Sequence, residues 1–89
     1  MTSFASRRFW RAFEALPRAI QRQAERAYEL WKNDPYHESL EFKRVHTKRP
    51  IYSVRIGLHW RAVGVKEGDT ITWFWIGSHS EYDVLIENL

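Results

Sequence analysis

The side chains best suited to chemistry follow one aromatic stretch near the end of the chain. Residues 71–76 (Ile-Thr-Trp-Phe-Trp-Ile) are β-branched and aromatic and lie between Gly68 and Gly77, which predicts a strand buried on both faces in the middle of a sheet. His79 and Tyr82 come directly after this strand. A histidine exchanges protons near neutral pH, and the end of a strand can hold polar side chains over a cleft, so we expect any chemical centre here.

Two arginines are the second candidate, and the turn between their strands decides where they point. The strand before the turn alternates, which places Val54 on one face and Arg55 on the other. A two-residue turn would pair Arg61 with Val54 and push its guanidinium onto the face that the helices cover, which is costly. A three-residue turn, Gly57 to His59, pairs Arg55 with Arg61. Because a slip of one residue turns every side chain to the other face, we predict this second register.

Like charges that face each other on neighbouring strands repel, so the arginine pair needs an explanation. Either each arginine has its own carboxylate or points into water, or an external anion bridges the two. Paired guanidiniums match phosphate oxygens bidentately, which favours a phosphate as that anion. The basic loop before the first of the two strands would extend the positive field with Lys43, Arg44, Lys48 and Arg49.

Whether His79 joins the arginines depends on the last turn between strands, which the sequence leaves open. If Val65 pairs with Ile71, then Gly77 shares the face of Arg61 and His79 follows it. Under that register the imidazole and the two guanidiniums converge. The other histidines, His37, His46 and His59, lie in predicted loops and are more simply explained as exposed residues.

The rest of the pattern predicts an α+β fold, with an N-terminal helical hairpin packed on a small antiparallel sheet and a short C-terminal helix, in a single domain over residues 1–89. Ser6 is a suitable N-cap, apolar residues recur at helical spacing as far as Leu16, and Pro17 starts a second helix that runs to about Lys32. The predicted strands are residues 40–45, 51–57, 60–66 and 71–77, with an edge strand at 2–5, and a capping box at Ser78 and Glu81 starts the final helix.

Composition narrows the classes of function. The formal charge of +3 and the pI near 9.5 indicate an anionic partner, either nucleic acid or an acidic protein. The chain has no cysteine, which excludes disulfides and thiolate metal sites and suits the cytoplasm. No apolar run approaches the ~20 residues of a membrane span, and no signal peptide is visible. No histidine pair has metal-ligand spacing, so we expect neither a metal nor another cofactor.

Three segments together resemble the RelE/ParE superfamily of bacterial toxins from type II toxin-antitoxin systems. They are residues 52–56 (Tyr-Ser-Val-Arg-Ile), 60–62 (Trp-Arg-Ala) and 76–82 (Ile-Gly-Ser-His-Ser-Glu-Tyr). The predicted order of the elements, two helices followed by three antiparallel strands, also resembles this superfamily. The most specific pieces are the aromatic-Arg pair at Trp60-Arg61 and the Gly-x-His-x-x-Tyr that ends at Tyr82, which looks like the histidine-bearing branch. The resemblance covers nearly the whole chain.

The resemblance implies a toxin that cuts messenger RNA on the ribosome by attack of the 2′ hydroxyl on the phosphodiester. Arg55 and Arg61 would then hold the scissile phosphate and stabilise its transition state. His79 would donate a proton to the leaving 5′ oxygen or act as the base on the 2′ hydroxyl, and Tyr82 would orient the phosphate or stack on a base. The same resemblance implies an acidic antitoxin peptide as partner. We expect this peptide on an exposed sheet face with apolar Ile51, Val63 and Val65 around the two arginines.

Ser53 departs from the family pattern. RelE-type nucleases commonly have a lysine at this position, and a serine cannot serve as a base or stabilise charge at neutral pH. Arg55 replaces another family lysine and keeps its charge without giving up a proton readily. Two other classes of function therefore stay open, a ParE-like inhibitor of DNA gyrase and a degenerate member that only binds its antitoxin.

Overall fold

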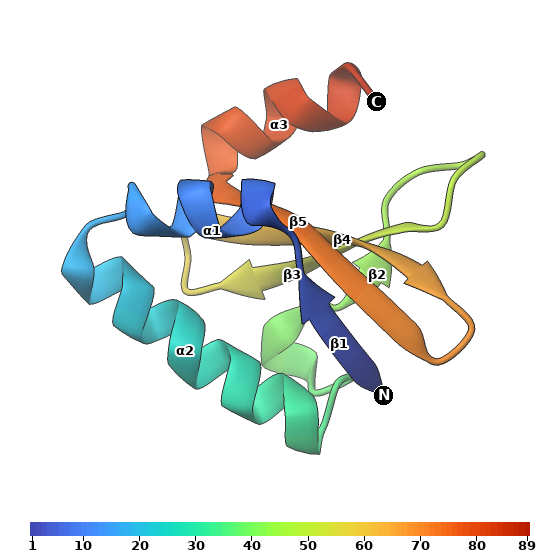
Figure 1. The fold of residues 1–89 in the computed structure, drawn as a ribbon, viewed down its shortest axis with the longest axis horizontal. Helices are drawn as coiled ribbons and strands as arrows, with labels where there is room; N and C mark the ends of the chain where they lie inside the picture. The colour runs from blue at the N-terminus through green and yellow to red at the C-terminus, as the bar shows by residue number, and fades with distance from the viewer.

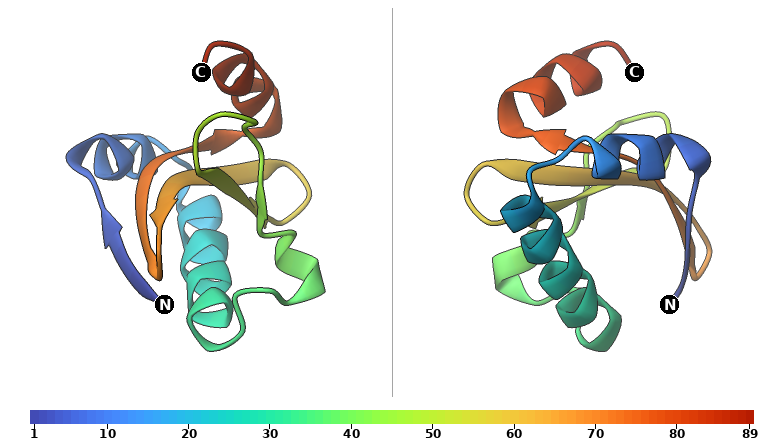
Figure 2. Two further views of the ribbon diagram at one scale, coloured as in Figure 1. Left: turned by 90° about the vertical axis from the view of Figure 1, so that its right-hand side faces the viewer. Right: turned by 60° about the vertical axis from the view of Figure 1, so that its left-hand side comes forward.

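The computed structural model describes residues 1–89 as three α-helices and five strands, with one short 3₁₀ turn. Figure 1 shows α2 and α3 on opposite sides of the sheet, and the two further views agree (Figure 2). None of the helices is both long and apolar enough to span a bilayer. In chain order the elements are β1 (Thr2–Ala5), α1 (Arg7–Glu14), α2 (Arg18–Asn33), η1 (Glu38–Leu40), β2 (Lys43–Arg44), β3 (Ile51–Ile56), β4 (Trp60–Glu67), β5 (Thr70–Ser78) and α3 (His79–Glu87).

The five strands form one sheet in the order β1-β5-β4-β3-β2. Strands β2 to β5 are antiparallel neighbours, as the sequence predicts, and the edge strand β1 adds to β5 in parallel. The strand predicted at 40–45 is shorter than expected, because η1 and the left-handed residue Glu41 precede the two paired residues of β2. Its aromatic residue Phe42 is buried in the core.

The helix boundaries follow their predicted signals. Ser6 caps α1 by accepting a hydrogen bond from the backbone N–H of Phe9 at 3.2 Å. Pro17 is the N-cap of α2, so the chain breaks between the two helices where proline was expected to break it. The two helices supply the apolar side of a core in which Trp31 and Trp73 meet edge to face.

The turn between β3 and β4 has the predicted register. Arg55 pairs with Arg61, Val54 with Ala62, and Gly57 takes a left-handed φ of 59° in the turn. Val54 and Ala62 lie in the core beneath the helices. The two arginines therefore occupy the opposite face of the sheet, as expected.

The turn between β4 and β5 differs from the register considered above. Val65 pairs with Thr72 and not with Ile71, and a bulge beside Val63 and Gly64 leaves Phe74 as the extra residue of β5. Because of this extra residue, Gly77 still shares the face of Arg61, as expected, and the two residues pair directly. It also separates the two tryptophans of β5, so that Trp73 joins the core and Trp75 faces the other way.

The face that carries the arginines is not open along its whole length, which corrects the expectation of an exposed apolar surface there. Helix α3 turns back over β4 and β5 on this side (Figure 1). Ile51 and Val63 are 1% and 0% exposed, and only Val65 of the expected apolar set keeps partial exposure. The capping box of Ser78 and Glu81 produces this covering, because it starts a helix at the point where β5 ends.

Candidate active site

Arg55 and Arg61 lie directly across from each other on β3 and β4, and Gly77 of β5 continues the same row. A Cβ atom at Gly77 would lie 2.5 Å from Cζ2 of Trp75, so the indole ring covers the position opposite Arg61. The row therefore consists of two guanidiniums followed by an aromatic surface. Such a surface combines charge for a phosphate with a flat face for a base.

The two arginines have different partners, so the alternatives left open by the sequence divide between them. Arg55 donates from Nη1 to Oε2 of Glu41 at 3.2 Å and from Nε to the carbonyl of Gly57 at 3.0 Å. Arg61 donates only to the carbonyl of Trp60, at 3.0 Å, and has no carboxylate partner. Arg55 is thus neutralised from within the chain, and Arg61 retains an uncompensated charge.

His79 is the first residue of α3, as predicted, at the point where β5 leaves the sheet. Its backbone N–H donates to the carbonyl of His59 at 2.7 Å, which fixes the start of the helix against the turn between β3 and β4. Its Nδ1 lies 3.2 Å from Oδ2 of Asp83, one turn further along, and the side chain is about half exposed. No hydrogen bond joins Nε2 to the protein, and none joins His79 to either arginine.

Tyr82 lies over Ser53 on the same face of the sheet as the arginines. Its hydroxyl donates to the Ser53 Oγ at 3.3 Å, and Ser53 is only 2% exposed. The aromatic rings of Tyr82 and His79 are 6.0 Å apart in an edge arrangement. Ser53, where the resemblance implied a lysine, is therefore covered by α3, and Tyr82 anchors that helix to the sheet.

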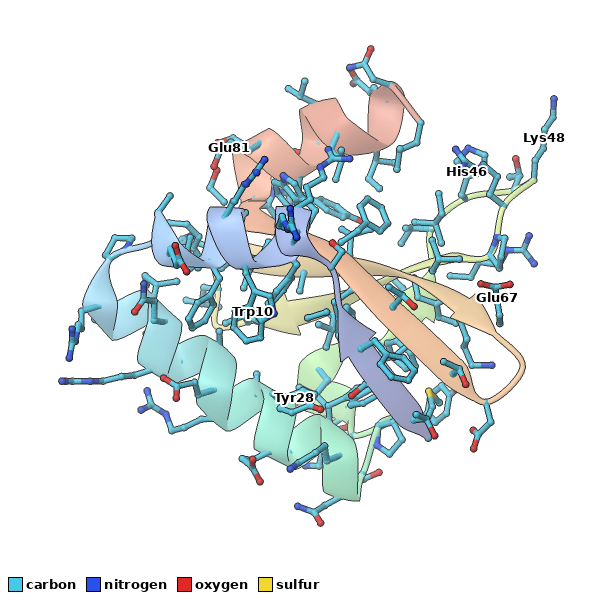
Figure 3. The ribbon with its side chains drawn as sticks, viewed as in Figure 1. Trp10, Tyr28, His46, Lys48, Glu67 and Glu81 are labelled. Atoms are coloured by element: carbon cyan, nitrogen blue, oxygen red, sulfur yellow. The ribbon has the colours of Figure 1, made fainter.

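The basic loop is organised by a residue that sequence reasoning assigned to solvent. His46 Nδ1 accepts hydrogen bonds from the backbone N–H groups of Lys48 and Arg49 at 3.1 and 3.0 Å. Its Nε2 lies 3.1 Å from the carbonyl oxygen of Leu89, which links the loop to the end of α3. Figure 3 shows Lys48 extending outward from the loop beyond His46. The cations of the loop are exposed, as predicted, but its shape depends on His46.

A second surface feature lies on the other side of the sheet, where β1, α1 and α2 surround an apolar hollow of about 430 Å³. Fourteen of its sixteen lining residues are hydrophobic, and Phe4, Trp10 and Tyr28 on its border are 59%, 49% and 39% exposed. Figure 3 labels Trp10 on α1 and Tyr28 on α2. The sequence shows these aromatic residues, but without the third dimension nothing indicates that they surround one hollow.

No three histidine or carboxylate side chains lie close enough together to bind a metal ion. The site therefore offers guanidiniums, an imidazole, a phenol and a carboxylate as its chemical groups. The guanidiniums of Arg55 and Arg61, with the imidazole of His79 at the end of the neighbouring strand, suit phosphoryl transfer at a phosphodiester.

Comparison with known protein families assigns the chain to a family of toxins. Residues 18–84 match the family model described as "ParE-like toxin domain". Because this match covers most of the chain, the protein belongs to the ParE-like toxin family, within the RelE/ParE superfamily. A search of curated protein sequences gave no match.

Solved structures show the same fold at low sequence identity. The RelB-RelE antitoxin-toxin complex from Methanococcus jannaschii aligns with a TM-score of 0.72 at 20% identity, over 91% of this chain and 96% of the other. YafQ from E. coli strain BL21(DE3) gives 0.73 at 8% identity, over 90% and 94%. The isolated E. coli RelE toxin gives 0.65 at 10% identity, over 99% and 98%.

Proposed function

We propose that this protein is an endoribonuclease toxin that cuts messenger RNA on the ribosome. The observation that carries the proposal is the pairing of Arg55 with Arg61 on the same face as the start of α3, with one guanidinium left free. Two guanidiniums match the oxygens of one phosphodiester, and His79 supplies a group that can transfer a proton near neutral pH. The structural likeness to RelE and YafQ supports the same interpretation.

The reaction is an attack of the ribose 2′ hydroxyl on the adjacent phosphorus. The bond from phosphorus to the 5′ oxygen breaks, which leaves a 2′,3′-cyclic phosphate on one product and a 5′ hydroxyl on the other. Arg61 and Arg55 stabilise the additional negative charge of the phosphorane, and His79 acts as the acid on the leaving oxygen or as the base on the 2′ hydroxyl. DNA lacks the attacking hydroxyl, so it is not a substrate.

Tyr82 and the basic loop position the RNA in this scheme. The Tyr82 ring is partly exposed beside His79, where a base could contact it, while its hydroxyl donates to Ser53. Lys43, Arg44, Lys48 and Arg49 are exposed and provide sequence-independent contacts to RNA backbone, of the message or of the ribosome.

The partner in the resting state is an acidic antitoxin peptide, and its docking surface is the hollow between β1, α1 and α2. The expected surface around Ile51 and Val63 is covered by α3, whereas the hollow presents exposed aromatic residues around an apolar floor. Helices α1 and α2, which border the hollow, carry three arginines each, and an amphipathic helix with acidic flanks would suit both the apolar hollow and these basic helices. These arginines are Arg7, Arg8 and Arg11 on α1 and Arg18, Arg22 and Arg26 on α2.

Inhibition of DNA gyrase is the second candidate function. The matching family model is ParE-like, and the buried Ser53 supplies no proton-transfer group where RelE-type nucleases commonly have a lysine. A protein of this kind would stop growth without cutting RNA. A degenerate member that only binds its antitoxin would not stop growth at all.

Expression without a partner gene separates the three functions. The nuclease arrests growth and leaves transcripts with new 5′ hydroxyl ends, only where ribosomes translate them. His79→Ala and Arg61→Ala abolish cleavage while circular dichroism shows an intact fold. Growth arrest with intact transcripts and relaxed DNA would favour the gyrase inhibitor, and harmless expression would favour the degenerate member.

A further inference from the structure

We propose that a pocket between α2 and the turn from β3 to β4 is a subsite that takes a purine base of the RNA strand. The proposal rests on the nuclease function above and deepens it, because it adds a position at which the protein distinguishes one base from another. The pocket lies on the helix side of the turn that joins the two arginine strands.

The pocket is open to solvent and has a volume of about 540 Å³, within the range of sites for small ligands. Helix α2 supplies Ile20, Gln23 and Arg26, and the turn supplies residues 57–60 (Gly-Leu-His-Trp). Figure 1 shows this turn beside α2. Only three of the seven lining residues are hydrophobic. Unlike the hollow between β1, α1 and α2, this pocket therefore offers hydrogen-bonding groups as well as apolar surface.

Gln23 connects the helix to the turn. A Cβ atom at Gly57 would lie 2.8 Å from Oε1 of Gln23, so the amide lies directly against the glycine and a larger residue there would displace it. The φ of 59° at Gly57 also favours glycine. The Gln23 side chain is partly buried, and its amide makes no hydrogen bond within the protein. Its donors and its acceptor are therefore available to a ligand.

The polar groups of the pocket match the edge of a purine. A glutamine amide pairs bidentately with N6 and N7 of adenine, and an arginine guanidinium pairs with O6 and N7 of guanine. Arg26 is exposed and pairs with no carboxylate, so both Gln23 and Arg26 are free to read a base. Ile20, Leu58 and Trp60 provide apolar surface for its flat faces. Single-stranded RNA exposes both the edges and the faces of its bases.

The same turn holds the chemical groups on the other side of the sheet. Three of its carbonyl oxygens accept hydrogen bonds from the residues of the candidate active site. They are the carbonyls of Gly57, Trp60 and His59, which accept from Nε of Arg55 at 3.0 Å, from Nη1 of Arg61 at 3.0 Å and from the backbone N–H of His79 at 2.7 Å. An RNA strand that leaves the arginines across this turn therefore reaches the pocket next.

The competing interpretation is that the cations of α2 form a solvated surface that attracts RNA whatever its sequence. Under this interpretation Arg26 acts like Arg22, which lies one turn earlier on α2, is exposed and does not line the pocket. A base site differs because cleavage then depends on the base that lies in the pocket. The two polar side chains should also affect different bases.

The first test maps the RNA ends that the protein produces on translating ribosomes. With the unmodified protein, we expect purines to be favoured over pyrimidines by about tenfold at one fixed position near the cut, as one bidentate contact allows. Gln23→Leu keeps the size of the side chain and removes its amide, so it should lose the preference for adenine and keep that for guanine. Arg26→Ala should do the reverse, and Arg22→Ala should keep both preferences.

The second test locates the base without any cleavage. Nuclear magnetic resonance of the unmodified protein follows the backbone N–H of Gly57 and the side-chain amide of Gln23 during titration. A 2′-deoxy substituted RNA that contains purines should shift both signals, and an all-pyrimidine RNA of the same length should shift neither. Adenosine monophosphate lacks the contacts of the strand with the two arginines, so it should need a concentration at least about tenfold higher.

Three results would overturn the proposal, and they differ from one another. An unchanged base preference in Gln23→Leu and Arg26→Ala, or the same change in Arg22→Ala as in Arg26→Ala, would remove the subsite and leave the nuclease function standing. Binding of adenosine monophosphate as tightly as the RNA would assign the pocket to a free nucleotide. Absence of cleavage by the unmodified protein on translating ribosomes would remove the nuclease function and the subsite with it.

Discussion

Arg55 and Arg61 face each other across two antiparallel strands, yet only Arg55 is paired with a carboxylate. The asymmetry makes Arg61 the stronger attractor of an external anion, because no internal charge has to be displaced first. A charge-assisted hydrogen bond from Arg61 to such an anion contributes about 1.5–3 kcal/mol to binding.

Replacing Arg61 with alanine should therefore weaken RNA binding by about 10- to 150-fold, since each 1.4 kcal/mol changes affinity tenfold. Arg18→Ala, on exposed α2, removes the same charge away from the arginine face and is the control. Binding of a 2′-deoxy substituted RNA, measured by fluorescence anisotropy, gives the comparison. Equal affinities for the two variants would contradict the role of Arg61.

The hydrogen bond from the Tyr82 hydroxyl to Ser53 Oγ should couple the stability of α3 to that of the sheet. A double-mutant cycle with Tyr82→Phe and Ser53→Ala should give a coupling free energy of about 0.5–1.5 kcal/mol in urea unfolding, as for a single hydrogen bond. A coupling near zero would mean that α3 is held by its apolar contacts alone.

Restoring the family lysine should not restore a family site. Ser53 is buried beneath Tyr82, so Ser53→Lys would place an ammonium where it has no partner or would displace α3. We expect a lower melting temperature and no gain in cleavage. A stable Ser53→Lys variant that cuts RNA faster would show that α3 yields readily at this position.

Gly77 and Gly68 offer a matched pair for the packing of the site. A Cβ at Gly77 would lie 2.5 Å from the Trp75 ring, whereas one at Gly68 meets nothing within 4 Å and carries only the cost of its φ of 60°. Gly77→Ala should cost about 1–3 kcal/mol through overpacking. Gly68→Ala should cost about 1–2 kcal/mol from its left-handed backbone. Only Gly77→Ala should also reduce cleavage, because its Cβ displaces the ring beside Arg61.

The hollow on the other side of the sheet makes a separate prediction. Trp10→Ser should weaken binding of an acidic amphipathic peptide at least tenfold with little loss of stability, because Trp10 is 49% exposed. Leu58→Ser, at a residue 69% exposed in the turn between β3 and β4, should leave peptide binding unchanged. Isothermal titration calorimetry with a designed acidic helix provides the measurement, and equal affinities would place the peptide elsewhere.

Local signals in the sequence predict most of the fold. Ser6, Pro17 and the capping box of Ser78 and Glu81 act within a few residues of themselves, and each marks a boundary where the structure has one. The pairing of Arg55 with Arg61 was also predictable, because the alternative register would bury a guanidinium. Both kinds of prediction need only short-range chemistry and the exclusion of a large cost.

The parts that sequence reasoning missed depend on contacts between distant residues. The sequence left the register of the last turn open, and no residue type predicts the bulge at Phe74 that sets it. Helix α3 covers the arginine face because of the direction that it takes after its N-cap. The hydrogen bond from the Tyr82 hydroxyl to Ser53 secures this direction, and it joins residues that are 29 positions apart in the sequence. The pairing of Glu41 with Arg55 spans 14 residues and follows from a left-handed turn in a segment expected to be a strand.

The most direct test of the central claim is a map of RNA ends from translating ribosomes incubated with the purified protein. The account predicts paired 2′,3′-cyclic phosphate and 5′ hydroxyl ends within messenger RNA, lost together in His79→Ala and in Arg61→Ala while both variants stay folded. Intact messenger RNA with the unmodified protein, or cleavage by either variant at the rate of the unmodified protein, would contradict it.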